Sequence, residues 1–380
     1  MKIKFKRNFP LYILYVVAAF LFILAFFLAK PKAETTLEAE EYAEYEKAKI
    51  TMVLTDNTEL DPNSDNSWRG EQLLLAEVTS GQYKGQTLQV SNYVGPLYST
   101  PLKEGDSAIL IISTYADGTH TGTVFEYNRT LPLIIIFGCF ILVTILIGGK
   151  TGAKSLLGLV ITLACLFFIL IPALMKGAPT LPTIFLVCAY ITVVTLAILG
   201  GLQKKTISAM LGTISGTAVA LLFGFLSQTL LRVDGMRVDD AEALLQLNQM
   251  GVPIGIKGLL VGGVVISALG AVMDVTMGIS SSLSEVHQAN PSLSLKELFR
   301  SGMNIGKDMV GTMTNTLILA LLGSDIILII YLYSLGLSSN QFFSSAYLSI
   351  EVISSISSSI GVILSIPLTA LFSSIALSKK

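Results

Sequence analysis

Ionisable and polar side chains interrupt two of the most apolar stretches of this chain. Residues 258–283 are long enough to cross a membrane and contain Asp274, and residues 304–322 form a second such stretch that begins with Asn304 and soon reaches Asp308. A carboxylate near the centre of a bilayer costs about 2.5–3.5 kcal/mol on an insertion scale, so it needs a partner, a water-filled cavity or a function. Groups of this kind can bind a proton, a cation or a small polar solute.

Helical spacing gathers these polar residues on one face of each stretch, because positions three, four or seven apart share a face. The first stripe contains Asp274, Ser281 and Glu285, and the second contains Asn304, Asp308, Thr312, Asn315 and Thr316. In antiparallel neighbouring helices the stripes would face and bury each other in the cytoplasmic half of the membrane. Hydrogen bonding between helices, worth roughly 0.6 kcal/mol a bond, is the plainer explanation for Ser and Thr, but it does not offset the cost of Asp274.

The composition indicates a polytopic α-helical membrane protein. The 380 residues are 52% hydrophobic and 13% charged, with a mean hydropathy of +0.70, whereas a soluble domain carries about 25% charge. Cys139, Cys165 and Cys188 all lie in apolar runs and match no metal motif. No cofactor is predicted, and whether a metal binds is left open.

Eight membrane-spanning helices are predicted from the apolar runs, at residues 11–29, 131–148, 156–175, 183–200, 207–231, 258–282, 304–322 and 356–377. The seventh is interrupted at 323–325, which is typical of a broken or bent helix; whether 323–335 also spans the membrane is left open. Close helix packing is expected at the glycines Gly212, Gly216, Gly270 and Gly311. Lys and Arg concentrate in the loops 149–155, 201–206 and 284–303, so the positive-inside rule places both termini in the cytoplasm and residues 31–130 on the outer side of the plasma membrane.

Three segments follow from this pattern: residues 1–30 with a basic N-terminus and an anchor, an acidic extracytoplasmic segment at 31–130, and the helical membrane domain at 131–380. Within the acidic segment, residues 34–49 favour helix by propensity. Five β-prone runs follow, at 49–54, 72–79, 86–93, 107–114 and 121–127. They predict a small antiparallel barrel or sandwich, such as an OB-like fold. Its acidic charge excludes a nucleic-acid partner.

The run from Gly270 to Asp325 resembles the signature of the YibE/F-like family of bacterial multipass membrane proteins, and the closing PLTAL at 367–371 fits as well. The resemblance extends over nearly the whole chain and implies no established activity. It implies that the motif positions Asp274, Ser281, Glu285, Asn304, Gly306, Asp308, Gly311, Thr312, Asn315 and Thr316 form the functional centre. Members of the family often have Arg where this chain has Lys307.

Three functions are compatible with these residues. A permease or channel would use Asp274 as its proton or cation site, with Asp308, Thr312 and Asn315 along the path. A membrane scaffold would hold a protein partner through its extracytoplasmic domain. An intramembrane aspartyl hydrolase would need Asp274 and Asp308 as a pair, but the two positions are offset in depth. We therefore expect no enzyme; the expected partners are the lipid bilayer, a small ion or solute, and a protein at the outer domain, and the oligomeric state is open.

Overall fold

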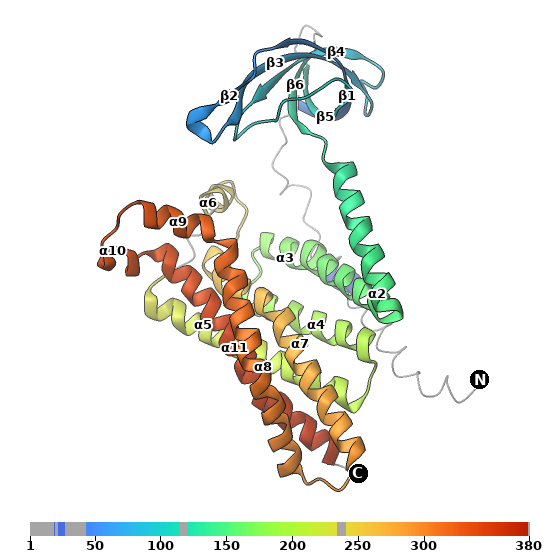
Figure 1. Cartoon of the computed structure of the whole chain (residues 1–380), viewed down its shortest axis with the longest axis vertical. Coiled ribbons are helices and arrows are strands. Elements are labelled where there is room, and N and C mark those ends of the chain that lie inside the picture. The colour runs from blue at the N-terminus through green and yellow to red at the C-terminus, as the bar shows by residue number, and fades with distance from the viewer. Residues whose placement is uncertain (1–18, 20–21, 27–42, 115–119, 234–240, 379–380) are drawn as a thin grey trace, which may run out of the picture. The chain divides into compact units, whose positions relative to one another are not determined.

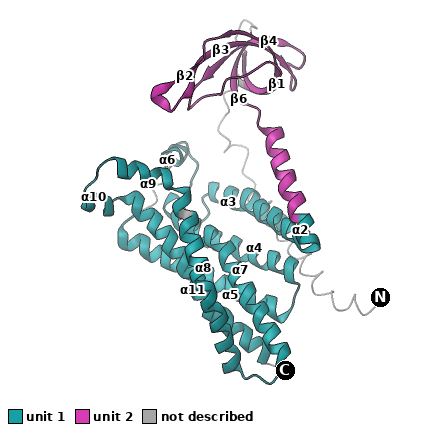
Figure 2. Ribbon diagram, viewed as in Figure 1, with its two compact units in different colours: residues 1–35, 145–380 teal, residues 36–144 magenta. Residues whose placement is uncertain are grey.

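The computed structural model describes residues 19, 22–26, 43–114, 120–233 and 241–378. The chain divides into two compact units, one of residues 36–144 and one of residues 1–35 with 145–380 (Figures 1 and 2). The first unit holds a β-barrel and the beginning of helix α2. The second holds a bundle of long apolar helices. Each unit is described by itself below.

The described part of the small unit contains six strands: β1 (Ala43–Asp56), β2 (Glu59–Asp61), β3 (Ser67–Val78), β4 (Thr87–Val94), β5 (Ser107–Thr114) and β6 (His120–Tyr127). Strand β1 pairs with both β3 and β5, and β4 pairs in parallel with β6. These pairings close β1, β3, β4, β6 and β5 into a five-stranded barrel around a core that includes Ile50, Leu74 and Leu110. The prediction of a small β-barrel is confirmed, with the OB-like rather than the sandwich arrangement. The prediction that all strands are antiparallel is wrong for the β4–β6 pair, which is parallel.

Two details of the barrel differ from the prediction. Residues 43–49 belong to strand β1 and not to a helix, because they pair with β5 from Ala43↔Ser113 to Lys49↔Ser107 and bury Ala48. Tertiary pairing here overrides the helix propensity of a Glu- and Lys-rich segment. The short strand β2, which forms a hairpin with β3 and is followed by the 3₁₀ turn Pro62–Ser64, was not predicted. Residues 34–42 of the predicted helical segment lie outside the described residues.

A buried glutamine ties one end of the barrel together. The Gln72 amide nitrogen donates to Asp56 Oδ2 at 2.8 Å and to the Leu102 carbonyl at 3.2 Å. Its amide oxygen accepts from the Leu102 N–H at 2.8 Å and from Asn92 Nδ2 at 2.9 Å. Asn92 Nδ2 also donates to the Thr100 carbonyl at 3.0 Å. These hydrogen bonds satisfy the polar atoms of the buried Gln72 side chain. They also anchor the segment between β4 and β5 to the barrel.

Asp56 in this network gives the barrel a pH-dependent stability. The Thr58 hydroxyl, the Gln72 amide and the Thr58 N–H donate to the carboxylate and hold the pKa of Asp56 below its usual value. A lowered folded-state pKa stabilises the fold above the unfolded pKa of about 3.9, and this contribution is lost as the pH falls through the folded-state value. We expect Asp56→Asn to lower the melting temperature at pH 7 and to reduce its further fall towards pH 3. Thermal unfolding followed by the fluorescence of Trp68, the single tryptophan, measures both effects; parallel pH curves for variant and wild type would contradict the assignment.

The described helices, from α2 onward, are α2 (Thr130–Cys165), the π turn η3 (Leu166–Leu170), α3 (Ile171–Met175), α4 (Thr180–Gly200), α5 (Lys204–Leu231), α6 (Ala241–Gln249), the 3₁₀ turn η4 (Ile256–Gly258), α7 (Leu259–Ala289), α8 (Leu295–Ser324), α9 (Ile326–Ser334), α10 (Ser339–Phe343) and α11 (Ala346–Ser378). Helix α2 begins in the small unit and continues into the helical one. Helices α5, α7 and α8 all pack against α11 (Figure 1).

Five helical segments of the described chain are long and apolar enough to cross a membrane, or six if α8 and α9, bent by 62° at Asp325, form one span. The predicted bend of the seventh span is present, but the predicted number of eight spans is not confirmed. Residues 131–148 and 156–175 belong to one 46-residue helical segment, Thr130–Met175, in which a kink at Gly149 separates two helices. The predicted loop 149–155 is helical, since only Gly149 leaves helical geometry (φ 52°, ψ −130°), which glycine tolerates. The predicted anchor at 11–29 lies mostly outside the described residues.

Small residues at every fourth position join α5 to α11. On α5 these are Ser208, Gly212, Gly216, Ala220 and Gly224, and on α11 they are Ser357, Gly361, Ser365, Thr369 and Ser373. A Cβ built on Gly212 would lie 2.0 Å from Thr369 Oγ1, and one on Gly216 would lie 2.6 Å from Ser365 Cβ. Each step of four along α5 is matched by a step of four back along α11, so the helices are antiparallel and their backbones approach closely.

Candidate functional site

The polar stripe of α7 is an open face of the helix. Asp274 is at the midpoint of α7, and the exposed residues on its side of the helix are Gly263, Ser267, Gly270, Asp274 and Glu285, with Ser281 half-buried. On one flank, Met277 contacts α4, since a Cβ on Gly200 would lie 3.0 Å from Met277 Cε. On the other flank, Gly278 lies against Met309 of α8. The stripe therefore runs between the α4 contact and the α8 contact.

The polar stripe of α8 is also exposed, at Asn304, Asp308, Thr312, Asn315 and Thr316. Three contacts fix the antiparallel register of α7 and α8: Gly278 with Met309, Ile279 with Gly306, and Leu283 with Gly302. In this register Thr312 is level with Asp274. Asp308 is level with Gly278, one helical turn or about 6 Å further along the axis.

The expected burial of the two stripes against each other is not what the structure shows. Asp274 and Asp308 are exposed, and neither has a hydrogen bond or an ion pair among the described residues. Thr312 and Thr316 donate to carbonyls of their own helix, at Met309 and Thr312. Apolar side chains occupy the facing sides of the helices instead, since Ile279 and Leu283 of α7 pack with Met309 of α8 and Ile366 of α11.

The four glycines predicted to pack helices fall into two groups. Gly212 and Gly216 lie in the α5–α11 contact, as described above. A Cβ on Gly270 or Gly311 would meet no atom within 4 Å. These two glycines make no close helix contact in the described chain, because they lie on the same open faces as Asp274 and Thr312.

A second polar zone, buried between α5, α7 and α11, was missed in the sequence. The hydroxyls of Thr213 and Thr276 are 2.7 Å apart. Ser280 donates to the Lys205 carbonyl at 2.5 Å and accepts from Ser373 at 3.1 Å. The small residue at every fourth position of α11 was the signal that could have revealed it. The hydroxyls of these four residues are paired between helices, as expected of packing contacts, and those of Ser365 and Thr369 donate to carbonyls of their own helix, so we assign this zone to structure.

Comparison with known proteins gives one result. Residues 136–379 match the family model described as YibE/F-like protein. This chain belongs to the YibE/F-like family. No curated protein and no solved structure matches it. The matched region begins within α2 and ends with α11, so it includes both polar stripes and the α5–α11 contact, and the barrel lies outside it.

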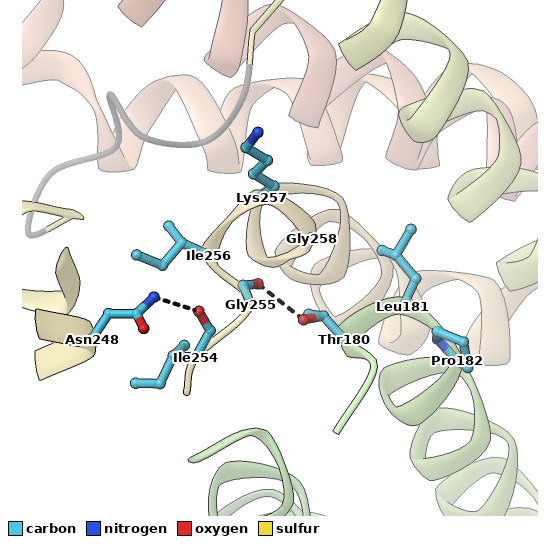
Figure 3. Close-up of a pocket in the computed structure, with 9 residues that line it drawn as sticks. All are labelled: Thr180, Leu181, Pro182, Asn248, Ile254, Gly255, Ile256, Lys257 and Gly258. Atoms are coloured by element: carbon cyan, nitrogen blue, oxygen red, sulfur yellow. Dashed lines mark hydrogen bonds between the residues drawn. The ribbon is translucent and has the colours of Figure 1, made fainter. Parts of the chain in front are cut away.

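The YibE/F-like region also contains a hollow of about 510 Å³ at the start of α4 and of α7 (Figure 3). Thr180 Oγ1 donates to the Gly255 carbonyl at 2.9 Å, and Asn248 Nδ2 donates to the Ile254 carbonyl at 3.1 Å, so the lining amide and hydroxyl are already engaged. Among the described residues that line the hollow, only Lys257 is charged. Gly258 is 16 residues from Asp274 along the chain, or about 24 Å in a helix. The hollow is therefore separate from the polar stripes, which remain the candidate site.

Proposed function

We propose that the membrane-embedded part of this YibE/F-like protein moves an ion or a small solute along the polar stripes of α7 and α8. The observation that carries the proposal is the position of Asp274: it is at the middle of an apolar helix, exposed, and without an ion pair or hydrogen bond among the described residues. Contact between a carboxylate and the lipid acyl chains is energetically unfavourable. A polar path along this face would supply the solvation that the chain itself does not.

The arrangement of the two stripes supports a path with more than one binding position. Asp274 is level with Thr312, and Asp308 is one turn away along the axis. Measured along the helix axis, the level of Asp308 is about 6 Å from the level of Asp274. Conduction needs sites of this kind, close enough to exchange an ion and weak enough to release it.

A scaffold is the second candidate, and the open glycines favour it. Gly263, Gly270 and Gly311 leave room for another helix to approach the same faces, and small residues are typical of helix interfaces in membranes. In that case Asp274 would pair with a polar group of a partner protein. The two functions differ in whether the chain alone moves ions.

The test is flux through the purified full-length chain in sealed liposomes. Proton movement is followed with an entrapped pH dye, and Na⁺, K⁺ and Mg²⁺ movement with ion-selective dyes, each against protein-free liposomes. We expect flux of at least one of these ions above the protein-free rate. Flux equal to that of protein-free liposomes for all of them would reject ion conduction and favour the scaffold.

A further inference from the structure

One end of the barrel is defined by the strand pairings and by the start of α2. The pairs Gly70↔Val94 and Ala108↔Tyr127, together with the parallel pairing of β4 and β6, bring the ends of β4 and β6 to the starts of β3 and β5. Helix α2 begins at Thr130, three residues after the end of β6. All these residues belong to the compact unit 36–144. We call this end of the barrel the α2 end.

Large apolar side chains are exposed at the α2 end. Leu60 and Trp68 face each other across the β2–β3 hairpin and are 47% and 46% exposed. Tyr93, at the end of β4, is 52% exposed, and Leu97 and Tyr98 in the following loop are 92% and 69% exposed. At the opposite end, the described loop 79–86 exposes small, polar and charged residues, since its Tyr83 is buried. The exposed Tyr45 near the start of β1 packs edge-on against Phe125.

Hydrogen bonds fix the α2 end to the first turn of α2. Asn128 donates from its backbone N–H to the Ser107 carbonyl at 2.9 Å and from Nδ2 to Ser107 Oγ at 3.0 Å. Its Oδ1 accepts from the N–H of Thr130 at 3.1 Å. The three residues from Tyr127 to Thr130 span at most about 10 Å. The barrel therefore cannot move far from the beginning of α2.

Helix α2 enters an apolar environment almost at once. Leu131 and Leu133 are 66% and 53% exposed, and the exposed apolar side chains continue to Ile147. Such a surface requires lipid or another apolar cover from its first turn onward. Because Tyr127 is within about 10 Å of that turn, the α2 end is the end of the barrel that lies nearest to the apolar surface of α2.

We propose that the α2 end of the barrel is a bilayer-contacting surface, on which Trp68, Tyr93, Leu97 and Tyr98 enter the headgroup region of the leaflet that α2 enters. Tryptophan and tyrosine favour this region because their rings are apolar at one side and polar at the other. Charge contributes little to the contact. Arg69 and Arg129 are paired with Asp61 and Glu126, and the exposed Lys103 is close in sequence to Glu104 and Asp106. The α2 end therefore has no excess of basic charge and requires no anionic lipid.

The single tryptophan makes this contact measurable in the full-length protein. In liposomes of zwitterionic phosphatidylcholine with brominated acyl chains, we expect the fluorescence of Trp68 to be quenched by the lipid. Its quenching by aqueous acrylamide should fall by at least about twofold relative to the detergent-solubilised protein, as for an interfacial ring. High salt should change neither result, since apolar burial carries the contact.

Two variants in a Trp68→Phe background calibrate the signal. Lys84→Trp places the ring on the loop at the opposite end of the barrel and should be quenched by acrylamide and not by the lipid. Phe137→Trp places it on the exposed surface of α2 and should be quenched by the lipid alone. The proposal is overturned if brominated lipid leaves Trp68 unquenched, whether the ring is then open to acrylamide or covered by a second copy or another protein.

Discussion

Replacing Asp274 with asparagine should reduce ion flux in liposomes by at least about tenfold, because an amide can neither bind a proton nor neutralise a cation in the membrane. Asparagine has nearly the same size, and Asp274 is exposed without a hydrogen bond among the described residues. The substitution therefore removes charge without disturbing a contact within the chain. Flux should be measured in parallel with thermal unfolding, which we expect to be unchanged.

Glu285→Gln is the matched control for this result. Glu285 lies on the same face of α7, four residues before the helix ends at Ala289, where water solvates a carboxylate at little cost. We expect it to retain most of the flux, and we expect Asp308→Asn to fall between the two variants. Wild-type flux in folded Asp274→Asn would remove Asp274 from the path. If the chain is a scaffold and Asp274 is part of the interface, Asp274→Asn should release the partner. If the carboxylate is outside the interface, the partner should stay bound.

The barrel could be predicted from the sequence to a large extent because its strands alternate and are separated by turn residues. The five predicted runs correspond to β1 and β3–β6, and the closure of the barrel then follows from β1 pairing on both edges. The sequence was misleading at 43–49, where Glu and Lys favour helix locally. Pairing with β5 and burial of Ala48 and Ile50 decide the conformation there, and neither can be read from local propensity.

In the membrane region, the polar stripes were predicted but their surroundings were not. Helical spacing gives the face on which Asp274, Ser281 and Glu285 lie, yet it does not say what that face meets. The surroundings depend on α11, because α5 and α7 both pack against it through small residues. This packing uses other faces of α7 and leaves the Asp274 face open. The kink at Gly149 could not be predicted either. A positive φ at this one glycine joins two helices where the sequence indicated a loop.

Enlarging Gly216 should have the largest effect on stability. A Cβ at this position would lie 2.6 Å from Ser365 Cβ, 2.9 Å from Val272 Cγ1 and 3.1 Å from the Gly361 carbonyl oxygen. Ser365 Cβ and the Gly361 carbonyl are close to the α11 backbone and cannot rotate away. We expect Gly216→Val to force α5 and α11 apart and to destabilise the protein by about 3 kcal/mol, the upper part of the usual cost of overpacking. Thermal unfolding in detergent measures the loss.

Gly270→Val provides a control with the same change of side chain. Both glycines are inside long helices, so the difference in helix propensity is the same, but a Cβ on Gly270 meets nothing within 4 Å. We expect its melting temperature to stay close to that of the wild type. Equal losses at the two positions would show that the α5–α11 contact is not the cause. A stable Gly270→Val protein that loses flux or a bound partner would instead show that the open face of α7 is occupied in the working protein.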